Sequence, residues 1–140
     1  MADPNVNKGK RALRDDVFRK ARDVAVLDGD ILSVLRSLER PGDSVSFLDD
    51  VIDSFVEETP GILDSLVEAI RLNGLASILH YSHQLKGFSG NIGVSRLSSL
   101  CEAIEDHASA LEEYDSDEIC ILLTQAYTNA IQELENDWKR

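Results

Sequence analysis

Residues 75–111 read LASILHYSHQLKGFSGNIGVSRLSSLCEAIEDHASAL, and this stretch decides the fold. Its apolar residues recur at intervals of three and four, which is the spacing of one face of an α-helix. The pattern pauses at Gly90-Asn91-Ile92-Gly93 and then resumes, so it predicts two helices joined by a turn. A connection this short favours antiparallel neighbours.

A long amphipathic stretch precedes this pair. Ser46-x-x-Asp49 resembles a capping box with Asp in the Glu position, and an apolar stripe follows it as far as Ile70. Pro60-Gly61 interrupts the stripe, but the periodicity resumes in phase, so we expect a kink and no full break. Asn73-Gly74 then has the composition of a helix C-cap.

A last amphipathic stretch follows the pair. Asp115-Ser116 supplies cap residues, and the stripe runs from Ile119 to Trp138, whose ring we expect to anchor the helix in the core. No segment shows sustained two-residue alternation. From Phe47 onward the sequence therefore predicts an all-α protein, an antiparallel up-down-up-down four-helix bundle.

The sequence before Phe47 predicts additional helical structure. Residues 11–27 carry apolar residues at helical spacing, and Asp30 is a plausible N-cap for a short second helix that Pro41-Gly42 ends. We interpret residues 1–29 as a tail with an accessory or linker helix, and residues 30–140 as the bundle domain.

Composition excludes several classes of function. A formal net charge of −12 over 140 residues disfavours nucleic acid and anionic lipid as partners. No segment has the length and apolar character of a membrane span or a signal peptide, so we expect a cytoplasmic protein, although a parent protein could be anchored in the inner membrane. Cys101 and Cys120 fall inside apolar stripes, which is typical of buried, reduced thiols.

One segment departs from the rules of helix composition. A glycine in the interior of a helix is less favourable than an alanine by roughly 1 kcal/mol. Nevertheless, Gly87 lies one turn after His83 in the predicted helix, and Gly90 follows it. A helical wheel places His83 at the edge of the apolar stripe and Gly87 beside it, toward solvent. The missing side chains would leave the imidazole accessible, and such a local violation is typical of a functional site.

The residues around this imidazole suit phosphoryl chemistry. Neutral imidazole is a good nucleophile near pH 7, and attack on a phosphoryl group needs an unobstructed approach. Lys86 can place its ammonium beside the charge of that group. The chain has no phosphate-binding loop, no kinase signature and no clear magnesium cluster, so we expect no ATP site and no bound cofactor, and therefore no enzyme.

His83-Gln84-Leu85-Lys86-Gly87, followed by Ser89 and Gly90-Asn91-Ile92-Gly93, closely resembles the signature of histidine-phosphotransfer (HPt) domains. The resemblance extends over roughly residues 30–112. It implies a phosphorelay protein of two-component signalling, of the kind found at the C-terminus of bacterial hybrid sensor kinases. It further implies that receiver domains are the partners, that a kinase core can lie in the same parent chain, and that the receiver supplies Mg²⁺.

By this resemblance, His83 is the phosphoacceptor, Lys86 stabilises the phosphoryl charge, and Gln84 forms a hydrogen bond near it. Gly87 and Gly90 give access to the site. We assign Leu79, His80 and Phe88 to the partner interface. Phe88 departs from the family, which usually has a small residue there; it either packs against the extra N-terminal helices or alters the choice of partner. For Tyr81 and Phe88 together we favour packing on a neighbouring helix, for which the one at residues 11–27 is a candidate, over an exposed interface.

Two other functions remain open from sequence. The bundle could be a docking or regulatory module that binds a receiver or another partner without carrying phosphate. It could also bind zinc, with His80 and His83 on one helical face and His107 with Glu102 or Asp106 on the next helix.

Overall fold

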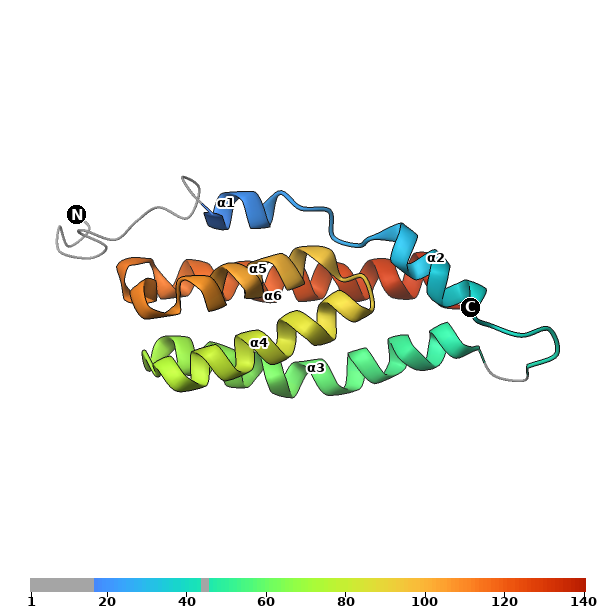
Figure 1. The fold of residues 1–140 in the computed structure, drawn as a ribbon, viewed down its shortest axis with the longest axis horizontal. Helices are drawn as coiled ribbons and strands as arrows, with labels where there is room; N and C mark the ends of the chain where they lie inside the picture. Colours follow the sequence, from blue (N-terminus) through green and yellow to red (C-terminus); the bar gives the residue numbers. More distant parts are fainter. Residues whose placement is uncertain (1–16, 44–45) are drawn as a thin grey trace.

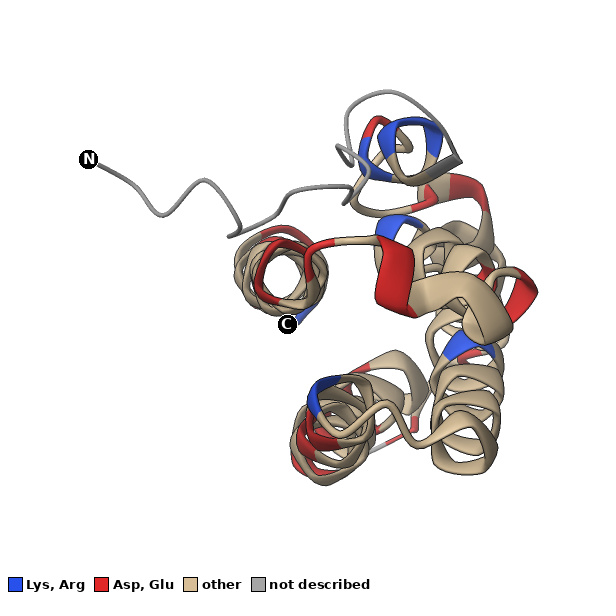
Figure 2. Ribbon diagram, turned by 90° about the vertical axis from the view of Figure 1, so that its left-hand side faces the viewer, with Lys and Arg blue, Asp and Glu red and all other residues tan. Residues whose placement is uncertain are grey.

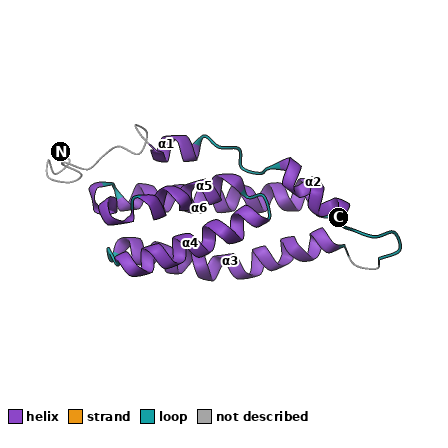
Figure 3. Cartoon of the chain, viewed as in Figure 1, coloured by secondary structure: helices purple, strands orange, loops and turns teal. Residues whose placement is uncertain are grey.

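The computed structural model describes residues 17–43 and 46–140 of the chain (Figure 1). Helices account for nearly all regular structure, and no β-strand occurs in these two ranges (Figure 3). The long helices are α3 (Phe47–Arg71), α4 (Leu75–Asn91), α5 (Ser95–Asp106) and α6 (Ser116–Glu133). Two shorter ones, α1 (Val17–Arg22) and α2 (Gly29–Ser37), precede them.

The four long helices form the expected antiparallel bundle. Each packs on two others: α4 lies between α3 and α5, and α6 closes the ring against both of these. The view along the bundle shows the four helices around a common core, with α1 beyond α5 (Figure 2). The fully buried core side chains are aliphatic for the most part, and they include Leu48, Ile52, Leu66, Leu85, Leu97, Leu100, Ile104, Leu123 and Leu134.

Helix α3 continues through Pro60 without interruption. Proline has no N–H, so the carbonyl of Val56, one turn earlier, loses its helical partner at this point. The hydroxyl of Tyr127 on α6 donates a hydrogen bond to that carbonyl, with an O–O distance of 3.4 Å. The next helix of the bundle therefore satisfies the group that the proline leaves exposed.

The two turns that flank α4 use left-handed backbone conformations. Asn73 has φ of 53° at the end of α3, so the asparagine and not Gly74 takes the left-handed position. Gly93 has φ of 81°, and a Cβ there would lie 3.1 Å from the carbonyl oxygen of Asp28. Gly93 also accepts a 2.7 Å hydrogen bond from the N–H of Asp28, so a glycine here joins the α4–α5 turn to the N-terminal segment.

The N-terminal elements differ in part from the sequence prediction. Within the described residues, the helix expected over 11–27 is α1 alone, and residues 11–16 lie outside the described residues. The N-cap of α2 is Asp28 and not Asp30. The carboxylate of Asp28 accepts hydrogen bonds from the N–H groups of Asp30 and Ile31. Ser46 caps α3 as predicted, accepting from the N–H of Asp49 at 3.2 Å.

The predicted helix over residues 94–111 ends earlier than expected. Helix α5 stops at Asp106, and a 3-10 helix, η2 (Ala108–Glu113), continues the chain. Asp115 caps α6, as its composition indicated. A π-helical turn, η3 (Leu134–Trp138), ends the chain, with Trp138 half-buried against the core.

A polar network ties this C-terminal turn to α2. The Arg36 guanidinium donates to the carbonyl of Trp138, to Glu39 at 2.9 Å and to the hydroxyl of Ser46 at 3.0 Å. The Ser46 hydroxyl in turn donates to Glu39, and this hydrogen bond is the main reason that the pKa of Glu39 lies below its usual value.

Two further sequence predictions concern the core and the membrane. Cys101 and Cys120 are buried, free thiols, and burial raises the pKa of both. Among the residues that the structure describes, no helix combines the length and hydropathy needed to cross a bilayer.

Candidate functional site

His83 projects from the solvent side of α4. The helix turns Ile78, Ser82, Leu85 and Ser89 into the bundle, and this register places the imidazole on the opposite side. Its side chain is 72% exposed. The ring therefore stands where another protein can reach it, as the sequence predicted.

A carboxylate from the neighbouring helix holds this ring in place. Oε2 of Glu105, on α5, lies 2.7 Å from Nδ1 of His83. The other oxygen of the same carboxylate accepts a 2.7 Å hydrogen bond from Nζ of Lys86. Glu105 thus bridges the two residues that the sequence singled out, and its side chain is only 20% exposed.

The electrostatics of this group favour charged Lys86 and charged Glu105. The hydrogen bond with Glu105 is the largest cause that raises the pKa of Lys86. The same bond, aided by the one to His83, holds the pKa of Glu105 below its usual value against the opposing effect of burial. At neutral pH Glu105 is therefore an anionic acceptor, and Nδ1 of a neutral His83 must be the nitrogen that carries the proton.

Sequence reasoning did not assign a role to Glu105. It placed Lys86 beside the imidazole on α4, but the partner that orients both side chains comes from a helix 22 residues away in sequence. The available signal was the register of α5: Leu97, Cys101 and Ile104 are buried, so Glu105 lies at the edge of the face that meets α4.

The two glycines of the motif have different surroundings. A Cβ built on Gly87 would meet nothing within 4 Å, so the space beside His83 is open, as expected. A Cβ on Gly90 would lie 3.2 Å from the hydroxyl oxygen of Ser98 on α5. That hydroxyl donates to the carbonyl of Lys86 at 2.9 Å, so Gly90 lets α4 and α5 approach closely and does not simply leave open space.

The residues around His83 form an exposed stripe along α4. Leu79 is 40% exposed, and His80 and Gln84 are also exposed. Leu75, 46% exposed, extends the stripe to the start of the helix. Helical spacing places Leu75 and Leu79 on the same side as His83, so apolar surface leads up to the imidazole.

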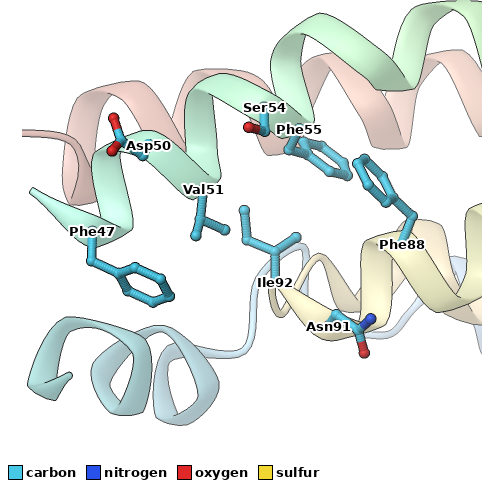
Figure 4. A pocket seen from close by; sticks show the side chains of 8 residues that line it. All are labelled: Phe47, Asp50, Val51, Ser54, Phe55, Phe88, Asn91 and Ile92. Carbon is cyan, nitrogen blue, oxygen red and sulfur yellow. The ribbon is translucent and has the colours of Figure 1, made fainter.

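Phe88 does not belong to this stripe: it packs on a neighbouring helix, as favoured from sequence, but that helix is α3 and not α1. Helix α1 packs on α5, whereas the ring of Phe88 stacks on Phe55 of α3 at a centroid distance of 5.7 Å. Figure 4 shows the two rings facing each other between α3 and α4. Both rings line a groove with a volume of about 410 Å³. Phe88 fills an inter-helix position, and the helix wheel turns it well away from His83.

The residues considered for zinc do not assemble into a site. Within residues 17–43 and 46–140, no group of three or more His, Cys, Asp or Glu is placed to hold a metal ion. His80 packs edge-on against Tyr81, and Nδ1 of His107 lies 3.0 Å from the carbonyl oxygen of Ala103.

Charge is distributed unevenly over the bundle. Helix α4 contains no Asp, Glu or Arg, and Lys86 is its single lysine. The whole chain, by contrast, has 26 acidic residues. Figure 2 shows α4 almost without acidic colour beside the other helices. An anionic group arriving at His83 therefore meets one cation on this helix and no carboxylate of the same helix.

Comparisons with known proteins agree with this geometry. The family model of the Hpt domain matches residues 50–137. No curated protein matches the chain. Among solved structures, the histidine-containing phosphotransfer protein B (HptB) from Pseudomonas aeruginosa PAO1 is similar, with a TM-score of 0.69 and 20% identity over 82% of this chain and 96% of that one.

The histidine-containing phosphotransfer protein MtHPt2 from Medicago truncatula is also similar, with a TM-score of 0.67 and 24% identity over 88% of each chain. At these identities the two structures establish a shared fold. The match to the family model covers most of the bundle. The chain therefore belongs to the Hpt domain family, whose members are phosphocarriers of two-component phosphorelays and have no ATP site of their own.

Proposed function

We propose that His83 is the phosphoacceptor of this chain and that Nε2 is its nucleophilic atom. The observation that carries the proposal is the 2.7 Å contact between Nδ1 of His83 and Glu105, on a ring that is 72% exposed. An ionised carboxylate only accepts hydrogen bonds, so it selects the tautomer with the proton on Nδ1. The lone pair then lies on Nε2, the nitrogen on the far side of the ring from Glu105.

The proposed reaction moves a phosphoryl group between a receiver aspartate and this imidazole. Nε2 attacks the phosphorus of an aspartyl phosphate, a P–N bond forms, the P–O bond to the aspartate breaks, and the aspartate leaves as a carboxylate. As positive charge develops on the ring, the Glu105 carboxylate beside Nδ1 stabilises it. The reverse reaction passes the group to the aspartate of another receiver.

Lys86 is proposed to stabilise the phosphoryl group. Its Nζ and Nδ1 of His83 contact the two oxygens of one carboxylate, so the ammonium is held close to the ring before any phosphate arrives. With a 31% exposed side chain, Lys86 has room to turn its ammonium toward a phosphoryl group on Nε2. Gln84, exposed one residue after His83, is proposed to add a hydrogen bond there. We expect the receiver to supply Mg²⁺.

The receiver is proposed to dock over the exposed stripe of α4. Leu75 and Leu79 provide apolar contact area, and His80 lies beside them. Apolar side chains make up most of the buried core of a typical interface. Gly87 leaves the open flank through which the aspartyl phosphate approaches. Phe88 is left out of this surface because it packs on Phe55.

The cellular setting is also a proposal. A relay through receiver aspartates places the chain in the cytoplasm, beside a sensor kinase core that is either a separate protein or a part of the same hybrid parent. Two features motivate the docking alternative, Phe88 and the N-terminal extension. The stacking of Phe88 on Phe55 accounts for the first of them through packing.

Transfer assays with variants of His83 test the proposal. Incubation with a receiver domain phosphorylated on its aspartate should give the chain a phosphate label that is stable in base and labile in acid. His83→Gln should abolish the label, whereas His80→Gln, a matched change three residues away, should keep it. A His83→Gln chain that is labelled as rapidly as wild type would contradict the assignment.

A further inference from the structure

A small hollow lies between α1 and α5. It has a volume of about 300 Å³, and its charged lining residues are Lys20 from α1 and Glu102 and Asp106 from α5. All three side chains are exposed. Two carboxylates and one ammonium give the hollow a net negative charge.

The hollow is close to the proposed phosphoryl site. Glu105 lies on the side of α5 that faces α4. Glu102 and Asp106 are three residues before it and one residue after it, and they lie on α5 between its α4 side and its α1 side. Both carboxylates act through charge to raise the pKa of Lys86, which places them within electrostatic range of the site. One surface thus runs from α4 across α5 to α1.

Helix α1 is firmly attached at the edge of this surface. Phe18 is fully buried, and its ring packs edge-on against Tyr114 at a centroid distance of 4.9 Å. The Arg96 side chain on α5 donates a 2.7 Å hydrogen bond to the carbonyl of Val24, just after α1. Lys20 therefore has a defined place beside Glu102 and Asp106, although α1 lies outside the residues that match the family model.

We propose that Lys20, Glu102 and Asp106 form a specificity-determining extension of the receiver-docking surface, and that the hollow receives a cationic side chain of the receiver. The inference rests on the proposed function, because it takes the receiver to dock over His83. A specific interface covers about 800 Å² of each partner, so a receiver centred on α4 must also cover neighbouring helices.

The two signs of charge in the hollow have opposite effects on such a partner. Glu102 and Asp106 attract a lysine or arginine, and Lys20 weakens that attraction. A partner with a carboxylate at this position is repelled. Charges at the edge of an interface act mainly on partner choice and on association, so their main effect should be on binding of the receiver.

Charge reversal with matched controls tests the extension. A panel of receiver domains is first phosphorylated with acetyl phosphate, and the receiver that transfers phosphate fastest to the wild-type chain is selected. The rate of phosphotransfer from this receiver is then measured for each variant. Glu102→Lys should raise KM about threefold or more, with a smaller change in kcat, and Lys20→Glu should lower KM. Raising the ionic strength should reduce both differences.

The controls carry the same charge changes at other places. Asp64→Lys alters the exposed face of α3, which is not a neighbour of α5 in the bundle, and Arg19→Glu alters α1 outside the hollow. Neither should change KM as much as its counterpart. If Glu102→Lys matches Asp64→Lys while wild type accepts phosphate, the extension alone is refuted. If wild type accepts phosphate from no receiver, the proposed function fails and the extension fails with it.

Discussion

At the scale of single residues, Glu105 organises the site. One carboxylate contacts Nδ1 of His83 and Nζ of Lys86, each at 2.7 Å. Because the lowered pKa of Glu105 and the raised pKa of Lys86 keep both groups charged at neutral pH, the arrangement should be stable there. The histidine is thus oriented and set in one tautomer before a partner arrives.

Removal of the Glu105 carboxylate should impair transfer without unfolding the bundle. We expect Glu105→Ala to slow phosphorylation of His83 about tenfold, the effect of losing one hydrogen bond to a charged group. Glu105→Gln keeps an acceptor oxygen for Nδ1 and should recover part of the rate. Nitrogen-15 shifts of the His83 ring should show the Nδ1-protonated tautomer in wild type and a mixture in Glu105→Ala. If the alanine variant shows the same tautomer as wild type, Glu105 does not select the tautomer of His83.

Removal of the Lys86 ammonium should lower the rate of phosphoryl transfer to His83. Lys86→Ala should slow transfer to His83 about tenfold, because a charge-assisted contact with the phosphoryl group is lost. Lys86→Arg keeps the charge and should retain more activity than the alanine variant. Rates of label transfer and circular dichroism check this prediction; equal rates for wild type and Lys86→Ala, with both chains folded, would contradict it.

At the scale of helices, the apolar periodicity predicted where α3, α4, α5 and α6 lie, because each must bury one face in the bundle. It did not predict contacts across helices, which depend on packing angle and register. Glu105 meeting His83 and Phe88 stacking on Phe55 are such contacts. The early end of α5 was also missed, because a 3-10 helix continues its apolar pattern from Ala108.

Gly87 and Gly90 should respond differently to the same substitution. Gly87→Ala adds a methyl group in open space, so it should raise the free energy of unfolding by roughly 0.5–1 kcal/mol through helix propensity. Gly90→Ala brings a methyl group to 3.2 Å from the Ser98 hydroxyl and should lose that gain. Gly87→Leu should stay folded but slow transfer by covering the flank of His83. Urea unfolding and transfer rates measure both effects; a Gly87→Leu chain that transfers at the wild-type rate would show that this flank is not the route of approach.

At the scale of the whole molecule, polar contacts connect the ends of the described chain to the bundle. Arg36 links α2 to Trp138 in the final turn, and Glu39 accepts from both Arg36 and Ser46. Gly93 and Asp28 link the α4–α5 turn to α2. The sequence showed the caps of this region but not the network, because its members are brought together only when the helices pack.

Glu39 should make stability depend on pH. Its pKa is lowered in the folded chain, chiefly by the Ser46 hydroxyl, so its contribution is present above the ordinary carboxyl pKa of about 4.3 and is lost as pH falls through the lower, folded value. Glu39→Gln should therefore lower Tm at pH 7, and the difference from wild type should shrink below about pH 4. Thermal unfolding at both pH values checks this; a difference that is constant with pH would exclude Glu39 as its source.

The central claim is that the phosphoryl group resides on Nε2 of His83. Nitrogen-15 and phosphorus-31 NMR of the histidine-labelled chain, after phosphorylation by a receiver domain, identifies both the residue and the ring nitrogen. The account predicts a single phosphorylated histidine, His83, with the P–N bond at Nε2 and the proton retained on Nδ1 beside Glu105. Phosphate on His80 or His107, or on Nδ1 of His83, would contradict it.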